Sequence, residues 1–207
     1  MATNNDTKPT TTLKLEPVTP DDISDITNLW YAAFGTPEML RIFPDTPGVR
    51  RWWDEANRND LLHKPTTRRY LKVVDTAADN RLVAYGKWVL AGVDEDGSRF
   101  PPWPADCDAR LCDDFFGAMA RERKRLLGER KNWYLDMLAT HPDYQGKGAG
   151  SMLVKWGCDL ADEEGVALYI DATPAGARLY KKFGFEDRSN PNYTLEGLVP
   201  MVREARN

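Results

Sequence analysis

The chain has 207 residues, of which 42% are apolar and 29% are charged, and its formal net charge is −4 at pH 7. A chain of this length and composition is typical of one globular domain that needs no disulfide or metal ion to be stable. Its net acidity gives no overall attraction to nucleic acid or to an anionic membrane, so neither is expected as a partner.

The sequence carries no membrane, secretion or metal-binding signal. It lacks a run of about 18 uncharged apolar residues, and its Thr- and Asn-rich start lacks the apolar core of a secretory signal. The three cysteines, Cys107, Cys112 and Cys158, are too few and too scattered for a disulfide framework. Two histidines without a Cys-x-x-Cys pair do not indicate a zinc site. We therefore expect a cytoplasmic protein without a bound metal.

The first half of the chain predicts a strand, two helices and a hairpin. Residues 1–12 are rich in Thr, Asn and Pro and are expected to form a disordered tail. Apolar periodicity then predicts, in chain order, a strand at 13–16, a helix at 20–34, a helix at 47–64, and strands at 69–75 and 81–91. Thr19 is placed to cap the first helix, which Gly35 and Pro37 interrupt.

The second half alternates helices and strands after a Pro-rich loop at residues 93–104. The elements predicted beyond this loop are a helix at 105–127, a strand at 132–140, a helix at 148–164, a strand at 166–172, and a helix at 175–182 followed by further strands. This order predicts a mixed α/β (α+β) fold over residues 13–207, with a central mixed sheet and helices on both faces.

A glycine-rich bend, residues 145–151, joins the strand that ends at Thr140 to the next helix. Alternating glycines let the backbone approach a ligand, and the N–H groups of the helix N-terminus then face outward. Such an arrangement binds anions, most often phosphate. The alternative is a tight strand-to-helix connection that binds nothing.

Two common phosphate motifs fit this bend poorly. A P-loop requires Ser or Thr after its lysine, whereas Gly148 follows Lys147. A dinucleotide-binding fold requires its glycines directly after the strand, whereas five residues separate Thr140 from Gly146. Asp171 does lie where that fold places its ribose-binding acid, so a nucleotide-dependent oxidoreductase stays a weaker alternative.

A third pattern fits better. Gln145-x-x-Gly148-x-Gly150 resembles the Arg/Gln-x-x-Gly-x-Gly/Ala acyl-CoA signature of the GNAT superfamily of N-acyltransferases. Residues 177–185, a short helix with Tyr180 that ends in Gly-Phe, resemble the second hallmark of that family. The close match covers residues 133–187. It implies a GNAT-like fold, with a mostly antiparallel twisted sheet splayed at the cofactor site, and acetyl-CoA as the cofactor.

The resemblance also implies roles for individual residues. The backbone of Leu138, Ala139 and Thr140 would pair with the pantetheine arm, and an N–H group near Leu138 would polarise the thioester carbonyl. The pyrophosphate would be held by the bend, that is by Gln145, Gly146, Lys147, Gly148, Ala149, Gly150 and Ser151. Thr173 stands near where many relatives have an asparagine that touches the cofactor; it either replaces that contact or caps the helix.

Two further groups are expected to move protons. Tyr180 would protonate the departing thiolate; the alternative is a half-buried core tyrosine. An alkylamine with a pKa of about 10.4 must lose a proton before it attacks. Asp136 is the first candidate for the base, since strict strand alternation places it on the same face as Leu138. Asp171 is the second candidate, and a water chain is a third possibility.

The acceptor side lies before residue 133. Phe34, Trp52, Trp53 and Trp88 are predicted to line an aromatic acceptor pocket, although each taken singly also fits core packing. Residues 93–130 look like a loop-helix insertion over the minimal fold, placed to cap that pocket.

The resulting prediction is an acetyl-CoA-dependent N-acetyltransferase that modifies a primary amine of a small molecule by direct attack in a ternary complex. The acceptor is left open among an amino sugar, a polyamine, a xenobiotic amine and a peptide N-terminus, as is the choice between monomer and homodimer. The alternative function is a non-catalytic acyl-CoA-binding regulatory domain.

Overall fold

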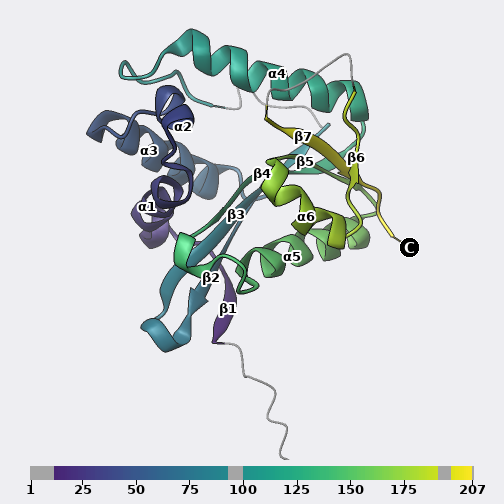
Figure 1. The fold of residues 1–207 in the computed structure, drawn as a ribbon, viewed down its shortest axis with the longest axis horizontal. Helices are drawn as coiled ribbons and strands as arrows, with labels where there is room; N and C mark the ends of the chain where they lie inside the picture. Colours follow the sequence, from purple (N-terminus) through teal and green to yellow (C-terminus); the bar gives the residue numbers. More distant parts are fainter. Residues whose placement is uncertain (1–11, 93–99, 191–196, 207) are drawn as a thin grey trace, which may run out of the picture.

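A seven-stranded sheet organises the computed structural model, which describes residues 12–92, 100–190 and 197–206 (Figure 1). The strand order is β1-β2-β3-β4-β5-β7-β6. The strands are β1 (Leu13–Pro17), β2 (Arg68–Asp75), β3 (Arg81–Ala91), β4 (Asn132–Thr140), β5 (Ala167–Ala172), β6 (Glu186–Asp187) and β7 (Val199–Arg203). All neighbours are antiparallel except β4 and β5, which confirms a mixed, mostly antiparallel sheet. The predicted tail, apart from Thr12, and residues 93–99 of the predicted insertion lie outside the described residues.

The parallel pair β4–β5 is hydrogen-bonded over only part of its length. Its ladder joins residues 132–134 of β4 to residues 167–169 of β5. Both strands continue beyond this ladder, so they diverge toward their carboxyl ends. The sheet is therefore splayed as expected, and the edge of β4 beyond Tyr134 is open to pairing with an extended ligand.

Helices cover both faces of the sheet, as predicted (Figure 1). Adjacent strand residues point to opposite faces, which β2 illustrates: Tyr70 packs with α1 (Ile23–Phe34) and α3 (Pro47–His63), whereas Leu71 packs with α5 (Ala149–Glu164). On the first face, α4 (Ala109–Leu127) packs on Tyr134 and Tyr169. On the second, α6 (Pro174–Lys182) lies beside α5.

The helices differ from the sequence-based prediction at several points. The helix predicted from residue 20 begins as α1 at Ile23, since residues 20–22 form a 3-10 turn. A short helix, α2 (Pro37–Ile42), follows the Gly35 interruption, because Thr36 caps it and proline is well tolerated in a first helical turn. The prediction of a helix from residue 105 was wrong by four residues, because the Asp108 carboxylate accepts the Leu111 N–H at 3.1 Å and starts α4 at Ala109. Short 3-10 turns complete the fold: Pro20–Asp22, Thr76–Ala78 and Pro142–Tyr144.

The contact between α5 and β3 leaves no room at Gly157. A Cβ atom there would overlap the indole of Trp88, which is itself fully buried. Gly157→Ala is therefore expected to lower the free energy of unfolding by about 1–3 kcal/mol, because the core must shift. Urea denaturation followed by circular dichroism measures this loss.

Gly117→Ala is the matched control, since Gly117 also lies inside a helix. An added Cβ there meets only the guanidinium end of Arg121, at 3.2 Å. Removing a helical glycine should then raise the free energy of unfolding by about 0.5–1 kcal/mol. Equal effects of the two substitutions would contradict the tight α5–β3 contact.

Candidate active site

The bend between β4 and α5 leaves backbone donors unpaired only where α5 begins. The N–H groups of Gln145 and Lys147, which were predicted to bind the pyrophosphate, donate instead to the carbonyl groups of Pro142 and Tyr144. Gly146 and Gly148 adopt positive φ angles of 74° and 97°, a region that favours glycine. No side chain in the described part of the chain caps α5. The first-turn N–H groups of α5 are therefore free to bind an anion. His141 has a structural role here, because its Nδ1 accepts the Asp143 N–H at 3.2 Å and orders the turn.

A cavity of about 460 Å³, here called the bend cavity, opens in front of these donors. Most predicted cofactor-binding residues line it: Leu138, Thr140, Gln145, Gly146, Gly148, Ala149, Gly150, Ser151, Thr173 and Tyr180. Phe34, predicted for the acceptor pocket, lines this cavity instead. Two predicted residues do not: Ala139 is fully buried toward α1, and the Lys147 ammonium lies 4.9 Å from the Tyr144 ring centre.

Thr173 caps α6 and also lies at the bend cavity. Its hydroxyl accepts the Gly176 N–H at 3.1 Å and so caps α6. The same residue lines the bend cavity. The cap holds α6 at the cavity wall, where the helix carries Tyr180.

Tyr180 reaches the bend cavity from α6 with only 5% of its surface exposed. Its ring packs edge-on against Phe185, with 5.8 Å between ring centres. Burial raises the pKa of its phenol well above the usual value of 10.0, because the phenolate would lose hydration. The phenol therefore stays protonated at neutral pH and can act as a proton donor.

A β-bulge in β4 moves Asp136 to the other face of the sheet. Lys87 pairs with Met137 and Trp88 with Leu135, so Asp136 is the extra residue. Leu135 and Leu138 both pack on the α5 face, whereas Asp136 forms an ion pair with Lys87 on the α3 face. The expectation that Asp136 shares a face with Leu138 was wrong, because the inserted residue breaks the alternation.

Asp136 belongs to a cluster of buried charges on that face. The Lys87 ammonium lies 3.2 Å from an Asp136 oxygen and 2.8 Å from an Asp60 oxygen, and Lys64 lies 3.2 Å from Asp60. The side chains of Lys87, Asp60 and Asp136 are 7%, 7% and 3% exposed. Nearby, the Tyr70 hydroxyl donates to Asn57 at 3.0 Å.

These pairings keep Asp60 and Lys87 ionised. Burial would raise the pKa of Asp60, but the Lys87 and Lys64 ammonium ions outweigh it and lower that pKa below 3.8. Burial would likewise lower the pKa of Lys87, but Tyr70 and Asp60 outweigh it and raise that pKa. The charges are thus held by one another in a place where neither sign would be stable alone.

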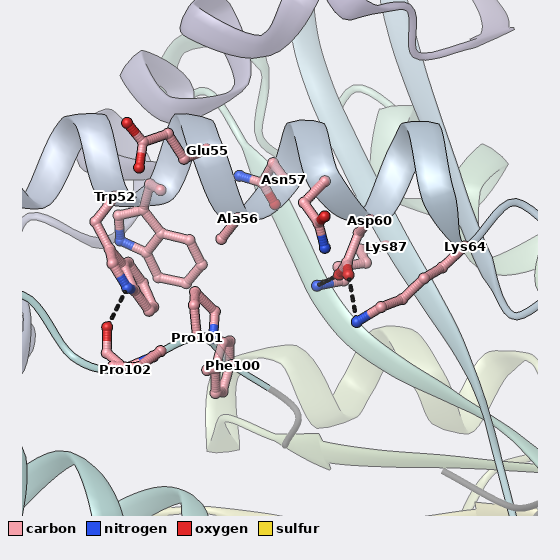
Figure 2. Close-up of a pocket in the computed structure, with 12 residues that line it drawn as sticks. Trp52, Glu55, Ala56, Asn57, Asp60, Lys64, Lys87, Phe100, Pro101 and Pro102 are labelled. Carbon is pink, nitrogen blue, oxygen red and sulfur yellow. Dashed lines mark hydrogen bonds and ion pairs between the residues drawn. The ribbon is translucent and has the colours of Figure 1, made fainter. Parts of the chain in front are cut away.

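A second cavity of about 590 Å³, here called the α3 cavity, lies beside this cluster (Figure 2). Trp52 and Trp53, which were predicted for the acceptor pocket, line this cavity, together with Asn57, Asp60, Lys64, Lys87 and residues 100–102. Trp88 does not reach this cavity, contrary to the prediction, because its side chain is packed under α5 against Gly157.

Asp171, the second candidate base, lies on β5 beyond the β4–β5 ladder. Its carboxylate accepts the Tyr169 hydroxyl at 2.6 Å. Of the two cavities described above, neither includes Asp171 in its lining. Asp136 is not among the lining residues either, but it contacts Lys87, which lines the α3 cavity.

The family follows from a comparison with known proteins. A model of the acetyltransferase (GNAT) family matches residues 36–185. The chain belongs to the GNAT acetyltransferase family. The "Probable acyltransferase SID5" of Ajellomyces capsulatus is 36% identical over 58 residues, which are 26% of this chain and 43% of that protein. The match therefore spans less than half of that relative's length.

Solved structures confirm the GNAT fold. The C-terminal condensation domain of Ebony, in complex with β-alanyl-dopamine, superposes with a TM-score of 0.67 at 12% identity, covering 95% of this chain and 100% of that one. The PaiA N-acetyltransferase of Thermoplasma acidophilum, in complex with coenzyme A, gives 0.59 at 12% identity, covering 93% and 98%. The likeness extends over nearly the whole of each chain, so the acetyltransferase fold includes the elements before residue 133.

Within residues 12–92, 100–190 and 197–206, two kinds of feature are absent. No helix there is both long enough and apolar enough to cross a membrane. No three side chains from His, Cys, Asp and Glu gather there as a metal-ligating group.

Lys87 and Asp60 are the site residues that sequence reasoning missed in this acetyltransferase. Both carried a signal. Lys87 is the only charged residue in a run of strand residues that are otherwise apolar or glycine, from 82 to 91. Asp60 follows Trp53 by seven residues in a helix, so it lies on the same buried face.

Proposed function

We propose that this GNAT protein is an acetyl-CoA-dependent N-acetyltransferase that modifies a primary amine of a small molecule by direct attack in a ternary complex. One arrangement carries the proposal: both cavities approach the strand β4. Leu138 and Thr140 of β4 line the bend cavity, and the α3 cavity reaches β4 through Lys87, which contacts Asp136. The first holds free helix N–H groups and the Tyr180 phenol, and the second has an aromatic wall and a buried charge cluster.

The bend cavity fits coenzyme A in three respects. The free N–H groups at the start of α5 suit its diphosphate. The positive-φ glycines, Gly146 and Gly148, leave no side chain between backbone and ligand. The unpaired edge of β4 beyond Tyr134 suits the amides of the pantetheine arm. A GNAT neighbour was solved as a coenzyme A complex, which supports the same cofactor here.

Acetyl-CoA, when bound, would supply an acetyl thioester, whose carbon–sulfur bond would break as the acceptor nitrogen bonds to the acetyl carbon. The Tyr180 phenol donates its proton to that sulfur, and a β4 N–H near Leu138 donates to the carbonyl oxygen. The carboxylate of Asp136 takes the proton of the acceptor amine, directly or through water, from the opposite side of β4. Holding both reactants on one strand contributes most to the rate, since well-oriented pairs gain about 7–11 kcal/mol.

Two measurements test this function. Isothermal titration should show coenzyme A and acetyl-CoA binding at micromolar concentrations. Release of free thiol in the presence of primary amines should then exceed the release without amine. Binding without amine-dependent thiol release would instead support the non-catalytic acyl-CoA-binding domain, and no binding would overturn both readings.

Gly148→Ala is expected to weaken acetyl-CoA binding by about tenfold. An L-residue with positive φ costs about 1–2 kcal/mol, and nothing lies within 4 Å of the added Cβ, so the effect is backbone strain in the bend. Titration calorimetry measures the Kd. Gly165→Ala is the control, because Gly165 has a φ of 66° at the other end of the same helix. The Gly165→Ala variant should lose a similar amount of folding free energy, but its Kd for acetyl-CoA should be unchanged. Equal changes of Kd in the two variants would contradict the assignment of the bend as the binding site.

A further inference from the structure

This inference rests on the proposed function and concerns its acceptor. We propose that the α3 cavity selects a primary amine attached by a short chain to a flat, uncharged aromatic ring. The amine lies at the Asp60–Lys87 end of the cavity, and the ring lies at the Trp52–Phe100 end.

One end of the α3 cavity is aromatic. Trp52, Trp53 and Phe100 line it, and their ring centres lie 5.0 Å apart between the tryptophans and 5.9 Å apart between Trp52 and Phe100. The Trp52 indole donates to the Pro102 carbonyl at 2.9 Å, which ties residues 100–102 across the cavity from α3 (Figure 2). Such a wall favours stacking and edge contacts with a flat ring.

The other end is polar, and cations surround its carboxylates. Lys64 and Lys87 pair with Asp60, and Lys87 also pairs with Asp136. Arg68, outside the cavity lining, adds a third cation, with its Nε 3.8 Å from Asp60. The end therefore offers hydrogen bonds to a neutral amine without demanding a second charged group on the acceptor. Because Lys87 contacts Asp136 in the β4 bulge, this is also the end next to the strand that carries Leu138.

This division disfavours the other acceptor classes. A polyamine needs a carboxylate for its distal ammonium group. Outside the charge cluster, Glu55 is the one carboxylate among the described residues that line the cavity, and it is exposed to solvent, where an ion pair contributes little free energy. An amino sugar would leave its hydroxyl groups against tryptophan and phenylalanine rings without hydrogen bonds, at a cost in free energy. A cavity of about 590 Å³ suits a ligand of one or two rings.

A panel of acceptors tests the class. Phenethylamine and tryptamine should show kcat/KM values at least about tenfold above those of spermidine and glucosamine, with hexylamine between them. Equal or higher kcat/KM for spermidine or glucosamine would overturn the inference and leave the proposed function standing.

Binding measured apart from turnover separates the two claims. Phenethylamine should bind the protein saturated with coenzyme A, as measured by calorimetry, more tightly than spermidine does. No such preference would overturn the inference. Selective binding of phenethylamine with no thiol release from acetyl-CoA in the presence of any amine would overturn the proposed function alone.

Phe100→Leu and Phe116→Leu locate the ring. Phe100 lines the α3 cavity, whereas Phe116 packs against Phe100 with 4.8 Å between ring centres and is not among the lining residues. Phe100→Leu should raise the KM of phenethylamine about five- to tenfold and leave that of hexylamine unchanged. Phe116→Leu should change neither the KM of phenethylamine nor that of hexylamine. If both variants raise both KM values alike, the effect is general loosening and the assigned position of the ring is wrong.

Discussion

Tyr180→Phe is expected to lower kcat by about 10²–10⁴-fold while leaving the Kd of acetyl-CoA nearly unchanged. The substitution removes only the hydroxyl, so the ring keeps its packing against Phe185 and its place in the wall of the bend cavity. A single positioned proton donor contributes a rate factor of this size. Steady-state thiol release gives kcat, and calorimetry gives the Kd.

Tyr85→Phe is the matched control for this experiment. Tyr85 is also buried, and burial likewise raises the pKa of its phenol, but it belongs to the lining of neither cavity. Its loss should leave kcat unchanged. A Tyr180→Phe variant that keeps wild-type kcat would show that the phenol is only a core residue. Because burial raises the pKa of Tyr180 above 10.0, a loss of activity between pH 7 and pH 10 would reflect the titration of another group.

Lys87→Met is expected to lower the free energy of unfolding by about 3–5 kcal/mol. The ammonium ion is the shared partner of two buried carboxylates, and removing one partner of a buried ion pair leaves charge that is no longer compensated. Lys155→Met is the control, since Lys155 pairs with Asp159 at the surface, where both side chains are more than half exposed. Surface pairs contribute about 0–1 kcal/mol. Urea denaturation compares the two losses.

The pH dependence of this effect has a defined sign. In the wild type, the pKa of Asp60 is lowered in the folded state, so the stability gained from its ionisation is present above pH 3.8 and is lost as the pH falls through the folded pKa. In Lys87→Met, the buried carboxylates gain most from binding protons. The deficit relative to the wild type should therefore shrink as the pH falls toward the unfolded-state carboxyl pKa of about 4. A deficit that is constant with pH would mean that lost packing, rather than charge, causes it.

The bend cavity was predictable because its residues are close in sequence. The glycines at 146–150 and Tyr180 lie within one strand-helix-strand-helix segment, and both the local backbone requirement and the family resemblance mark them. The cap at Thr173 was also visible as a threonine ahead of a proline. Because these residues lie within one continuous segment, the local backbone conformation largely determines their positions.

The lining of the α3 cavity was predicted only in part, because it depends on tertiary packing. The sequence does not distinguish Trp52, Trp53 and Trp88 from one another. In the structure Trp88 lies under α5 and therefore does not line the cavity that Trp52 and Trp53 line. Gly157 marks that contact, but nothing in the sequence says which strand it faces. The bulge at Asp136 adds one residue to β4 without changing the apolar pattern, so the alternation rule assigned that side chain to the wrong face.

The bulge in β4 also has an evolutionary consequence. The extra residue places Asp136 and Leu138 on opposite faces of the sheet. Substitutions on the α3 face can therefore change the α3 cavity without moving the backbone that faces α5. Under the proposed function, donor and acceptor recognition can then diverge separately. A new acceptor preference needs changes only around residues 52–64, 87 and 100–102, while residues 138–180 keep the chemistry common to all acceptors.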